Sequence, residues 1–388
     1  MKHFNVKIDS LSFGGEGIAR VDGKVCFVKG ALPGEEVSFL VSEESARYIK
    51  GYTEKIFSMS PDRMEPKCAY YGKCGGCHLQ HLSYEKELFY KRQEAVELMK
   101  RIGGLKDFNF EGALIEPSNK FYNYRSSITL HKNDKGKFGF FSTEGKDILP
   151  IDYCPIAEES INKEIKNIAS SVKNSRVTLK ADYLTKVFMS GRLGDRFFED
   201  KYLDKNLVMS PRAFSQCNRY IAEKIAVRIN EWGMDINESS GFFDVYSGVG
   251  FFSFLLNKNF KARIGIDSES IAIDCAKASM KKFFSKENFK FYRGEAEKEF
   301  FGIFSRNKLK NNIVLLDPPR SGLDRRFLEP FKKMKDISRI FYISCDPASL
   351  ARDIKILTLD SDWKLSRLSF FDMFPRTYHI ETLAEFTR

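Results

Sequence analysis

Cys345 follows an apolar run over residues 339–344 and precedes the polar turn Asp346-Pro347. An apolar run of this length, bounded by turn residues, predicts a buried strand. Ligands of open α/β sheets bind beyond the carboxyl ends of the strands, so the pattern predicts a thiol at the reactive edge of a sheet. A thiolate in that position can act as a nucleophile. An isolated cysteine is more often a buried structural residue, and the neighbouring strand ends favour chemistry here.

A second predicted strand, 312–317, ends at Asp317 and continues into Pro318-Pro319-Arg320. The two prolines stiffen the turn and carry no backbone N–H. A carboxylate therefore stands at a rigid strand end. Together with Cys345, it indicates one cleft that is built from several strand ends.

A third predicted strand, 241–246, ends at Tyr246 and leads into a loop that carries Gly248 and Gly250. Asp267 ends the following strand, at the distance used to hold ribose hydroxyls in doubly wound folds. The third glycine of the dinucleotide fingerprint is missing from the segment that follows Gly250. The loop therefore favours an adenosine ligand such as S-adenosylmethionine over NAD.

Four cysteines form a separate constellation in the first half of the chain. Cys68, Cys74 and Cys77 are clustered, with two glycines inside the C-x2-C pair, and Cys154 is remote. Four thiolates suit a tetrahedral site for zinc or an iron–sulfur cluster, and the spacing does not decide between them. Eight cysteines in a chain without a secretion signal also favour metal or catalytic use over a disulfide scaffold.

The composition of the 388-residue chain indicates a polyanionic partner. Its formal net charge is +11, and 36 Phe and 16 Tyr provide many rings that can stack on bases. The first residues lack an apolar signal region, and no run of eighteen apolar residues occurs. We therefore expect a cytoplasmic protein that binds RNA and does not enter a membrane.

The pattern of strands, turns and helices predicts three domains. Residues 1–58 alternate apolar and polar positions between glycine turns, which predicts an OB-like β-barrel. Residues 59–205 contain the four cysteines and a helix over 83–100, in a mixed α+β middle domain. Residues 206–388 follow a βαβ pattern, with strands at 241–246, 262–267, 289–293, 312–317, 338–344, 365–371 and 378–386. This pattern predicts an α/β fold with a doubly wound, Rossmann-like sheet.

These motifs together resemble the uracil-5 RNA methyltransferases that have an N-terminal TRAM domain and an iron–sulfur cluster. The resemblance covers essentially the whole chain. It is carried by the Cys68 to Cys77 segment with Cys154, Phe214-Ser-Gln216-Cys-Asn218, Asp244-Val-Tyr246-Ser-Gly-Val-Gly250, Asp317-Pro-Pro-Arg320, Ser344-Cys345-Asp-Pro, Asp372-Met-Phe-Pro375 and His379-Ile-Glu381. Asp267 stands where the family often has Glu, and Arg376 occupies a variable position.

The resemblance implies a class I methyltransferase fold and roles for named residues. Cys68, Cys74, Cys77 and Cys154 would bind a [4Fe-4S] cluster. Cys345 would be the nucleophile and Glu381 the base. The S-adenosylmethionine and uracil site would be lined by Gln216, Tyr246, Gly248, Gly250, Asp267, Glu295 and Asp317.

The implied activity is the formation of 5-methyluridine by a monomer, with 23S ribosomal RNA as the first choice of substrate. A transfer-RNA T-loop uridine is the alternative substrate. Two other functions stay open: a non-catalytic RNA-binding iron–sulfur protein, and an enzyme that methylates exocyclic nitrogens through the Asp317 turn. The second of these needs no cysteine and forms no covalent adduct with RNA.

Overall fold

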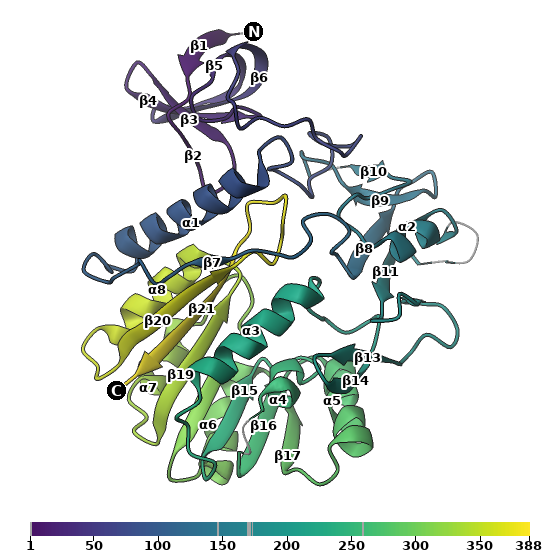
Figure 1. Cartoon of the computed structure of the whole chain (residues 1–388), viewed down its shortest axis with the longest axis vertical. Helices are drawn as coiled ribbons and strands as arrows, with labels where there is room; N and C mark the ends of the chain where they lie inside the picture. Colours follow the sequence, from purple (N-terminus) through teal and green to yellow (C-terminus); the bar gives the residue numbers. More distant parts are fainter. Residues whose placement is uncertain (1, 146, 169–171, 173, 258–259) are drawn as a thin grey trace.

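The computed structural model describes residues 2–145, 147–168, 172, 174–257 and 260–388. The described residues form sheets of six, five and eight strands and one two-stranded hairpin (Figure 1). Within the described ranges, no helix is long and apolar enough to cross a membrane.

The N-terminal sheet has the strand order β1-β5-β6-β4-β3-β2 and its own apolar core. Its strands are β1 (His3–Lys7), β2 (Ser10–Leu11), β3 (Gly17–Val21), β4 (Lys24–Lys29), β5 (Glu36–Glu44) and β6 (Tyr48–Ser58). Neighbouring strands are antiparallel except for β4 and β6. In the hydrogen-bond ladder of the described residues, β1 and β2 are the outer strands, so closure into an OB-like barrel stays a prediction.

The middle sheet has the order β10-β9-β8-β11-β12 and is followed by the hairpin β13-β14. Its elements are β8 (Ser127–Lys132), β9 (Phe138–Phe141), β10 (Ile148–Pro150), α2 (Glu159–Ile165), β11 (Arg176–Ala181), β12 (Val187–Met189), β13 (Phe198–Tyr202) and β14 (Lys205–Met209). The mixed α+β character agrees with the sequence pattern. The division of the chain at residues 58 and 205 remains a prediction.

The C-terminal sheet has eight strands in the order β17-β16-β15-β18-β19-β21-β20-β7. Its strands are β7 (Ile115–Glu116), β15 (Gly241–Val245), β16 (Ala262–Asp267), β17 (Phe289–Arg293), β18 (Asn312–Leu316), β19 (Ile337–Ser344), β20 (Lys364–Phe371) and β21 (Glu381–Thr387). The first five in the spatial order are parallel, and β21 is antiparallel to both of its neighbours. The predicted strands agree with these bounds to within a few residues.

Helices cover both faces of this sheet, because both faces of its parallel strands are apolar. Phe242 packs with helices on one face, whereas Phe243 and Val245 pack with helices on the other. The first face carries α3 (Arg219–Trp232), α4 (Phe251–Leu255) and α5 (Ser270–Phe283), and the second carries α1 (Tyr84–Arg101), α6 (Ala296–Asn307), α7 (Arg325–Phe331) and α8 (Pro347–Thr358). In Figure 1, α1 lies between the N-terminal and C-terminal sheets.

The strand order reverses direction at β15. The chain runs from β15 outward to β16 and β17, and then returns to place β18 and β19 on the other side of β15. Ligands of doubly wound sheets bind at such a switch point, beyond the carboxyl ends of the strands. The fold therefore places a crevice beside the residues that follow β15 and β18.

Candidate active site

Strand order brings the predicted cofactor residues together along one edge of the C-terminal sheet. Because β15 lies between β16 and β18, Tyr246 stands between Asp267 and Asp317. Cys345 follows β19, the next strand along the edge. Four strand ends that are separate in sequence thus form one row of side chains.

The antiparallel strand β21 adds Glu381 to this row. Ser344 is paired with Thr382 across β19 and β21, so Cys345 and Glu381 come next to this pair on neighbouring strands. Glu381 is 4% exposed. The predicted nucleophile and the predicted base are therefore neighbours.

A cavity of about 1010 Å³ lies over this edge and extends to the cysteine segment. Most of the predicted site residues line it: Cys68, Cys74, Cys77, Cys154, Gln216, Tyr246, Gly248, Asp267, Asp317, Cys345 and Glu381. The cavity therefore joins the two constellations that the sequence presents separately.

Gly250 and Glu295 are the two predicted site residues that do not line this cavity. Gly250 has a φ of 81°, and a Cβ there would lie 2.7 Å from the Phe254 ring, so its packing requires glycine. Glu295 precedes α6, and its 65% exposed side chain pairs with Lys298 at 2.7 Å. The ring of Phe254 thus packs directly against the second glycine of the loop.

Asp267 is oriented by two backbone donors. The N–H of Gly248 donates to Oδ2 at 2.8 Å, and the N–H of Glu269 donates to Oδ1 at 2.8 Å. Each carboxylate oxygen keeps a further lone pair. The carboxylate can therefore accept hydrogen bonds from the two hydroxyls of a ribose, which fits an adenosine ligand.

Three buried carboxyl groups lie close to one another at the switch point. Burial, partly offset by hydrogen bonds from Ser253, raises the pKa of Asp244 to about 7. Burial, with Asp244 and Asp267 nearby, raises the pKa of Asp317 to about 8. Burial and then Asp317 raise the pKa of Glu381 well above its usual range, although Arg320 opposes this. A pocket with this surplus of acidic groups favours a cationic ligand such as a sulfonium.

The same surroundings hold the proton on Cys345. Burial and then the nearby Glu381 raise the pKa of the thiol to about 12, whereas Arg320 lowers it. Arg320 Nη2 also lies 3.3 Å from His379 Nε2. Burial and then this guanidinium lower the pKa of His379 to about 3, so the imidazole is neutral and can accept from Arg320.

The cysteine segment wraps closely against the middle sheet. Cys74 forms a β-bridge with Ser142, and the N–H of Gly75 donates to Phe141 O at 3.0 Å. A Cβ at Gly75 would lie 3.1 Å from the carbonyl oxygen of Ser142. A glycine is therefore suited to this close approach, as the sequence suggests.

The four thiols influence one another. Burial raises the pKa of Cys77 to about 12; Gln80 lowers it, and Cys154, Cys74 and Cys68 raise it in that order. Across the described residues, no group of three or more His, Cys, Asp or Glu side chains is arranged to hold a metal ion. This result concerns the binding of a single ion. Thiolates that bind a multi-iron cluster stand farther apart than those that bind one ion, so the wider spacing of the four thiols is compatible with a cluster.

Unpartnered polar atoms at this end of the cavity fit a bound cluster. Both amide atoms of Gln80 and the hydroxyl of Ser142 are buried without a hydrogen bond, and both residues line the cavity with the thiols. Gln80 nevertheless lies close enough to affect Cys77. Donors near the sulfurs are a regular feature of iron–sulfur sites, so the donor set suits one.

Two residues that shape the site were not found from the sequence. Lys180 of β11 donates to Ala213 O and to Ser215 Oγ, the latter at 2.8 Å, and so ties down the loop that carries Gln216. Glu297 of α6 accepts from the Tyr246 hydroxyl at 2.9 Å. Neither has a local sequence signal, because each resembles an ordinary charge on a surface strand or helix.

Comparison with known proteins identifies two regions. Residues 175–387 match the family model described as tRNA (uracil-5-)-methyltransferase, and residues 2–51 match the TRAM domain. The first match covers more than half of the chain. Its members are S-adenosylmethionine-dependent RNA methyltransferases.

Two relatives match over almost their whole length. An uncharacterized RNA methyltransferase of Aquifex aeolicus is 30% identical, over 99% of this chain and 98% of its own. The 23S rRNA (uracil(1939)-C(5))-methyltransferase of Aliivibrio fischeri strain ES114 is 28% identical, over 100% of this chain and 97% of its own.

A solved structure shares the fold. The tRNA (uracil-54, C5)-methyltransferase of Pyrococcus abyssi, in complex with S-adenosyl-L-homocysteine, has a TM-score of 0.74 and 24% identity. The similarity covers 99% of this chain and 100% of that one.

Proposed function

The chain belongs to the tRNA (uracil-5-)-methyltransferase family, and from this membership we propose that it forms 5-methyluridine in ribosomal RNA through a covalent bond to Cys345. The observation that supports this most is the placement of Cys345 beside Glu381 on adjacent strands, over the cavity that Asp317 and Asp267 also line. A nucleophile and a base in one cavity are what the reaction requires.

Uracil C5 is a poor nucleophile, and covalent addition makes it reactive. The Cys345 thiolate forms a bond to C6, and the electrons of the C5–C6 double bond move toward C5 and the O4 oxygen. Because the thiol is hard to ionise, addition requires a proton acceptor and a cation nearby, and Arg320 and a bound sulfonium favour the thiolate. When bound, S-adenosylmethionine supplies the methyl group that C5 accepts.

Glu381 then completes the reaction as a base. Its carboxylate takes the proton from C5, the C5–C6 double bond re-forms, and the C6–sulfur bond breaks to release the Cys345 thiolate. Burial and Asp317 raise the pKa of Glu381, so its ionised form, which Arg320 and a bound sulfonium favour, is a strong proton acceptor. The carboxyl of Asp317, whose pKa is about 8, is mostly protonated at neutral pH and can donate to a uracil oxygen, and Gln216 lines the same cavity.

The cofactor would be held along the edge of the sheet. Asp267 would accept from the ribose hydroxyls, and the backbone at Gly248 and the ring of Tyr246 would line its pocket. Gly250 contributes by allowing the turn to pack. We do not assign a contact to Glu295, since its side chain pairs with Lys298 at the surface.

Cys68, Cys74, Cys77 and Cys154 would hold a [4Fe-4S] cluster at the other end of the cavity. The unpartnered Gln80 and Ser142 support this assignment. Methyl transfer moves no net electron, so the cluster is assigned a structural role that shapes the RNA-facing surface. Cys74→Ser should lose iron and sulfide, measured by chemical analysis, and active enzyme without iron would contradict the structural role.

Ribosomal RNA is the proposed substrate because the Aliivibrio fischeri relative, named for 23S rRNA, matches the whole chain. A uridine must leave its helix to reach a buried thiol. The positive charge of the chain and its TRAM domain support binding of the RNA backbone. The experiment that tests the substrate is to map 5-methyluridine in the RNAs of a strain without the gene. Loss of 5-methyluridine from ribosomal RNA would support the proposal, whereas its loss from the transfer-RNA T-loop would support the alternative.

The covalent step is tested with RNA that contains 5-fluorouridine, because fluorine at C5 leaves no proton for the base to remove. With S-adenosylmethionine, the protein should form an RNA adduct that survives denaturation. Cys345→Ala should form none, whereas Cys275→Ala, which changes a buried free cysteine of α5 outside the cavity, should retain it. An equal adduct with Cys345→Ala would refute the mechanism.

A further inference from the structure

The loop between β20 and β21, residues 372–380, ends directly at Glu381. Among the hydrogen bonds of the described residues, none is made by the Glu381 carboxyl group. Its position therefore depends on the backbone that leads into it. Phe374 of the same loop lines the cavity, and His379 contacts Arg320. Whatever fixes this loop also fixes the base.

Arg376, near the centre of the loop, has a φ of 69°, in the left-handed region that non-glycine residues rarely adopt. Such a conformation persists only when the surroundings impose it. The N–H of Arg376 donates to Glu87 Oε1 at 2.7 Å. Its carbonyl oxygen accepts from the N–H groups of His78 and Leu79 at 2.9 and 3.0 Å.

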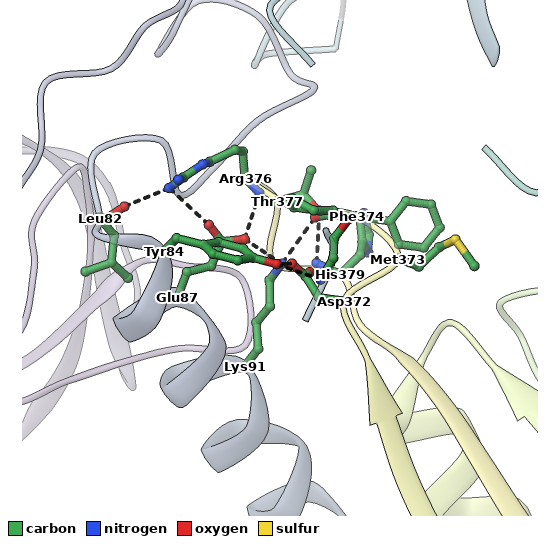
Figure 2. A network of polar contacts seen from close by, with 12 residues as sticks. Leu82, Tyr84, Glu87, Lys91, Asp372, Met373, Phe374, Arg376, Thr377 and His379 are labelled. Atoms are coloured by element: carbon green, nitrogen blue, oxygen red, sulfur yellow. Dashed lines mark hydrogen bonds and ion pairs between the residues drawn. The ribbon is translucent and has the colours of Figure 1, made fainter. Parts of the chain in front are cut away.

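The side chain of Arg376 is 4% exposed and extends the same anchoring (Figure 2). Its Nη1 donates to Leu82 O at 2.9 Å and lies 3.3 Å from Glu87 Oε2. The guanidinium also lies over the ring of Phe121, 4.6 Å from its centroid. One residue therefore connects the loop to the helix α1 and to the segment just after Cys77.

The first residues of the loop are held by the same network. Lys91 of α1 donates to Asp372 Oδ1 and Glu87 Oε1, each at 2.7 Å, and to Phe374 O at 3.1 Å. Figure 2 shows Lys91 and Arg376 reaching the same carboxylate from different sides. Two cations and two carboxylates compensate one another in a buried site.

We infer that Arg376 is a positioning residue for the methyltransferase reaction: it holds the 372–380 loop so that Glu381 stands beside Cys345. The inference rests on the proposed function, because it concerns the base of that reaction. No role is predicted for this position from the sequence, and only the fold places it against α1 and the cysteine segment. Arg376 acts through Glu381 and does not touch the reacting atoms.

Two substrates separate a positioning role from general destabilisation. Adduct formation with 5-fluorouridine RNA needs Cys345 and methyl transfer but no proton removal, whereas turnover of uridine RNA also needs Glu381. For Arg376→Ala, we expect the rate of fluorouridine adduct formation to stay within about threefold of the unchanged protein. Turnover of uridine RNA should fall at least tenfold, with a methylated covalent RNA complex accumulating, as we also expect for Glu381→Gln.

Arg376→Lys keeps a positive charge near Glu87 and should recover part of the turnover. Arg306→Ala, at an exposed arginine of α6, is the matched control and should leave both rates unchanged. If Arg376→Ala does not fold, the comparison is made with Arg376→Lys, for which we expect the same selective loss in smaller degree. Equal slowing of both reactions, or of neither, in the folded variants would overturn the inference. If the unchanged protein forms no fluorouridine adduct, the proposed function fails instead.

Discussion

The 372–380 loop carries a buried carboxylate at each end, and the two have opposite surroundings. Asp372 accepts from Lys91 and from the Tyr84 hydroxyl, each at 2.7 Å. Glu381 lies near Asp317, which raises its pKa further beyond the effect of burial. The same chemical group thus stabilises the fold at one end of the loop and is poised to take a proton at the other.

The two carboxyl groups differ in compensation: a compensated group has a cation or a hydrogen-bond donor in contact with it, and an uncompensated group has none. Around Asp372, each acid faces a cation or a hydroxyl within hydrogen-bond distance (Figure 2). Around Glu381, the acid Asp317 raises the pKa and the cation Arg320 lowers it, and no hydrogen bond among the described residues reaches its carboxyl group. A compensated cluster should therefore control stability, and an uncompensated one should control activity.

The largest expected effect is on the uncompensated side. Cys345→Ala should lower the rate of 5-methyluridine formation by about 10⁴-fold or more, because the covalent route is lost. The free energy of unfolding should change by less than about 1 kcal/mol, since a partly buried thiol is replaced without disturbing an ion pair. Nucleoside mass spectrometry and urea unfolding measure the two quantities. If Cys345→Ala lowered stability but not activity, Cys345 would be a structural residue and not the nucleophile.

The compensated side should respond in the opposite way. Lys91→Met leaves Asp372 buried without a cation and Glu87 with Arg376 alone, so the free energy of unfolding should fall by about 3–5 kcal/mol. Lys298→Met removes an exposed ion pair and is the control, with an expected change within about 0.5 kcal/mol. Urea unfolding checks both variants. A decrease below about 1 kcal/mol for Lys91→Met would show that the network contributes little to the fold.

Removal of the ionisable group of Asp317 from the acidic cluster should stabilise the protein in a defined pH range. Because the pKa of Asp317 is raised to about 8, the folded protein binds a proton that the unfolded chain releases above about pH 4. This contribution to stability is present at low pH and is lost as the pH rises through about 8.

Asp317→Asn removes the titration. Relative to the unchanged protein, its free energy of unfolding should rise progressively between pH 5 and pH 8, by at most about 1.4 kcal/mol for each pH unit, while activity falls. Urea unfolding at several pH values measures the slope. The same slope in both proteins would mean that Asp317 ionises normally.

The strand ends could be predicted from the sequence because their signal is local. An apolar run that stops at Asp317 or Cys345 marks a strand end, and a parallel sheet collects such ends at one edge. The neighbouring position of Glu381 follows from an antiparallel strand at the end of the chain. The predicted strand at 378–386 already contained it, although the structure begins β21 at Glu381 itself.

The support of the site could not be predicted, because it depends on contacts between distant segments. From the sequence, Arg376 resembles a variable loop residue, yet its N–H donates a hydrogen bond to the carboxylate of Glu87, 289 positions away. From the sequence, Lys180 resembles an ordinary lysine of a solvent-exposed strand, yet it donates a hydrogen bond to Ser215 and so holds the loop before Gln216 in place. Polar side chains lack the periodicity that reveals core residues, so their partners emerge only from the fold.

The smallest expected effect concerns Glu295, which the family resemblance places at the cofactor and the structure places at the surface. Glu295→Gln should change the Kd for S-adenosylmethionine by less than about twofold, since its partner is the exposed Lys298. Asp267→Asn, which weakens an acceptor fixed by two N–H groups, should raise that Kd by about tenfold or more. Isothermal titration calorimetry measures both. If Glu295→Gln and Asp267→Asn bind S-adenosylmethionine equally weakly, then the loop before α6 closes over the cofactor and Glu295 contacts it. Glu295 would in that case belong to the binding site, although its side chain pairs with Lys298 at the surface in this structure.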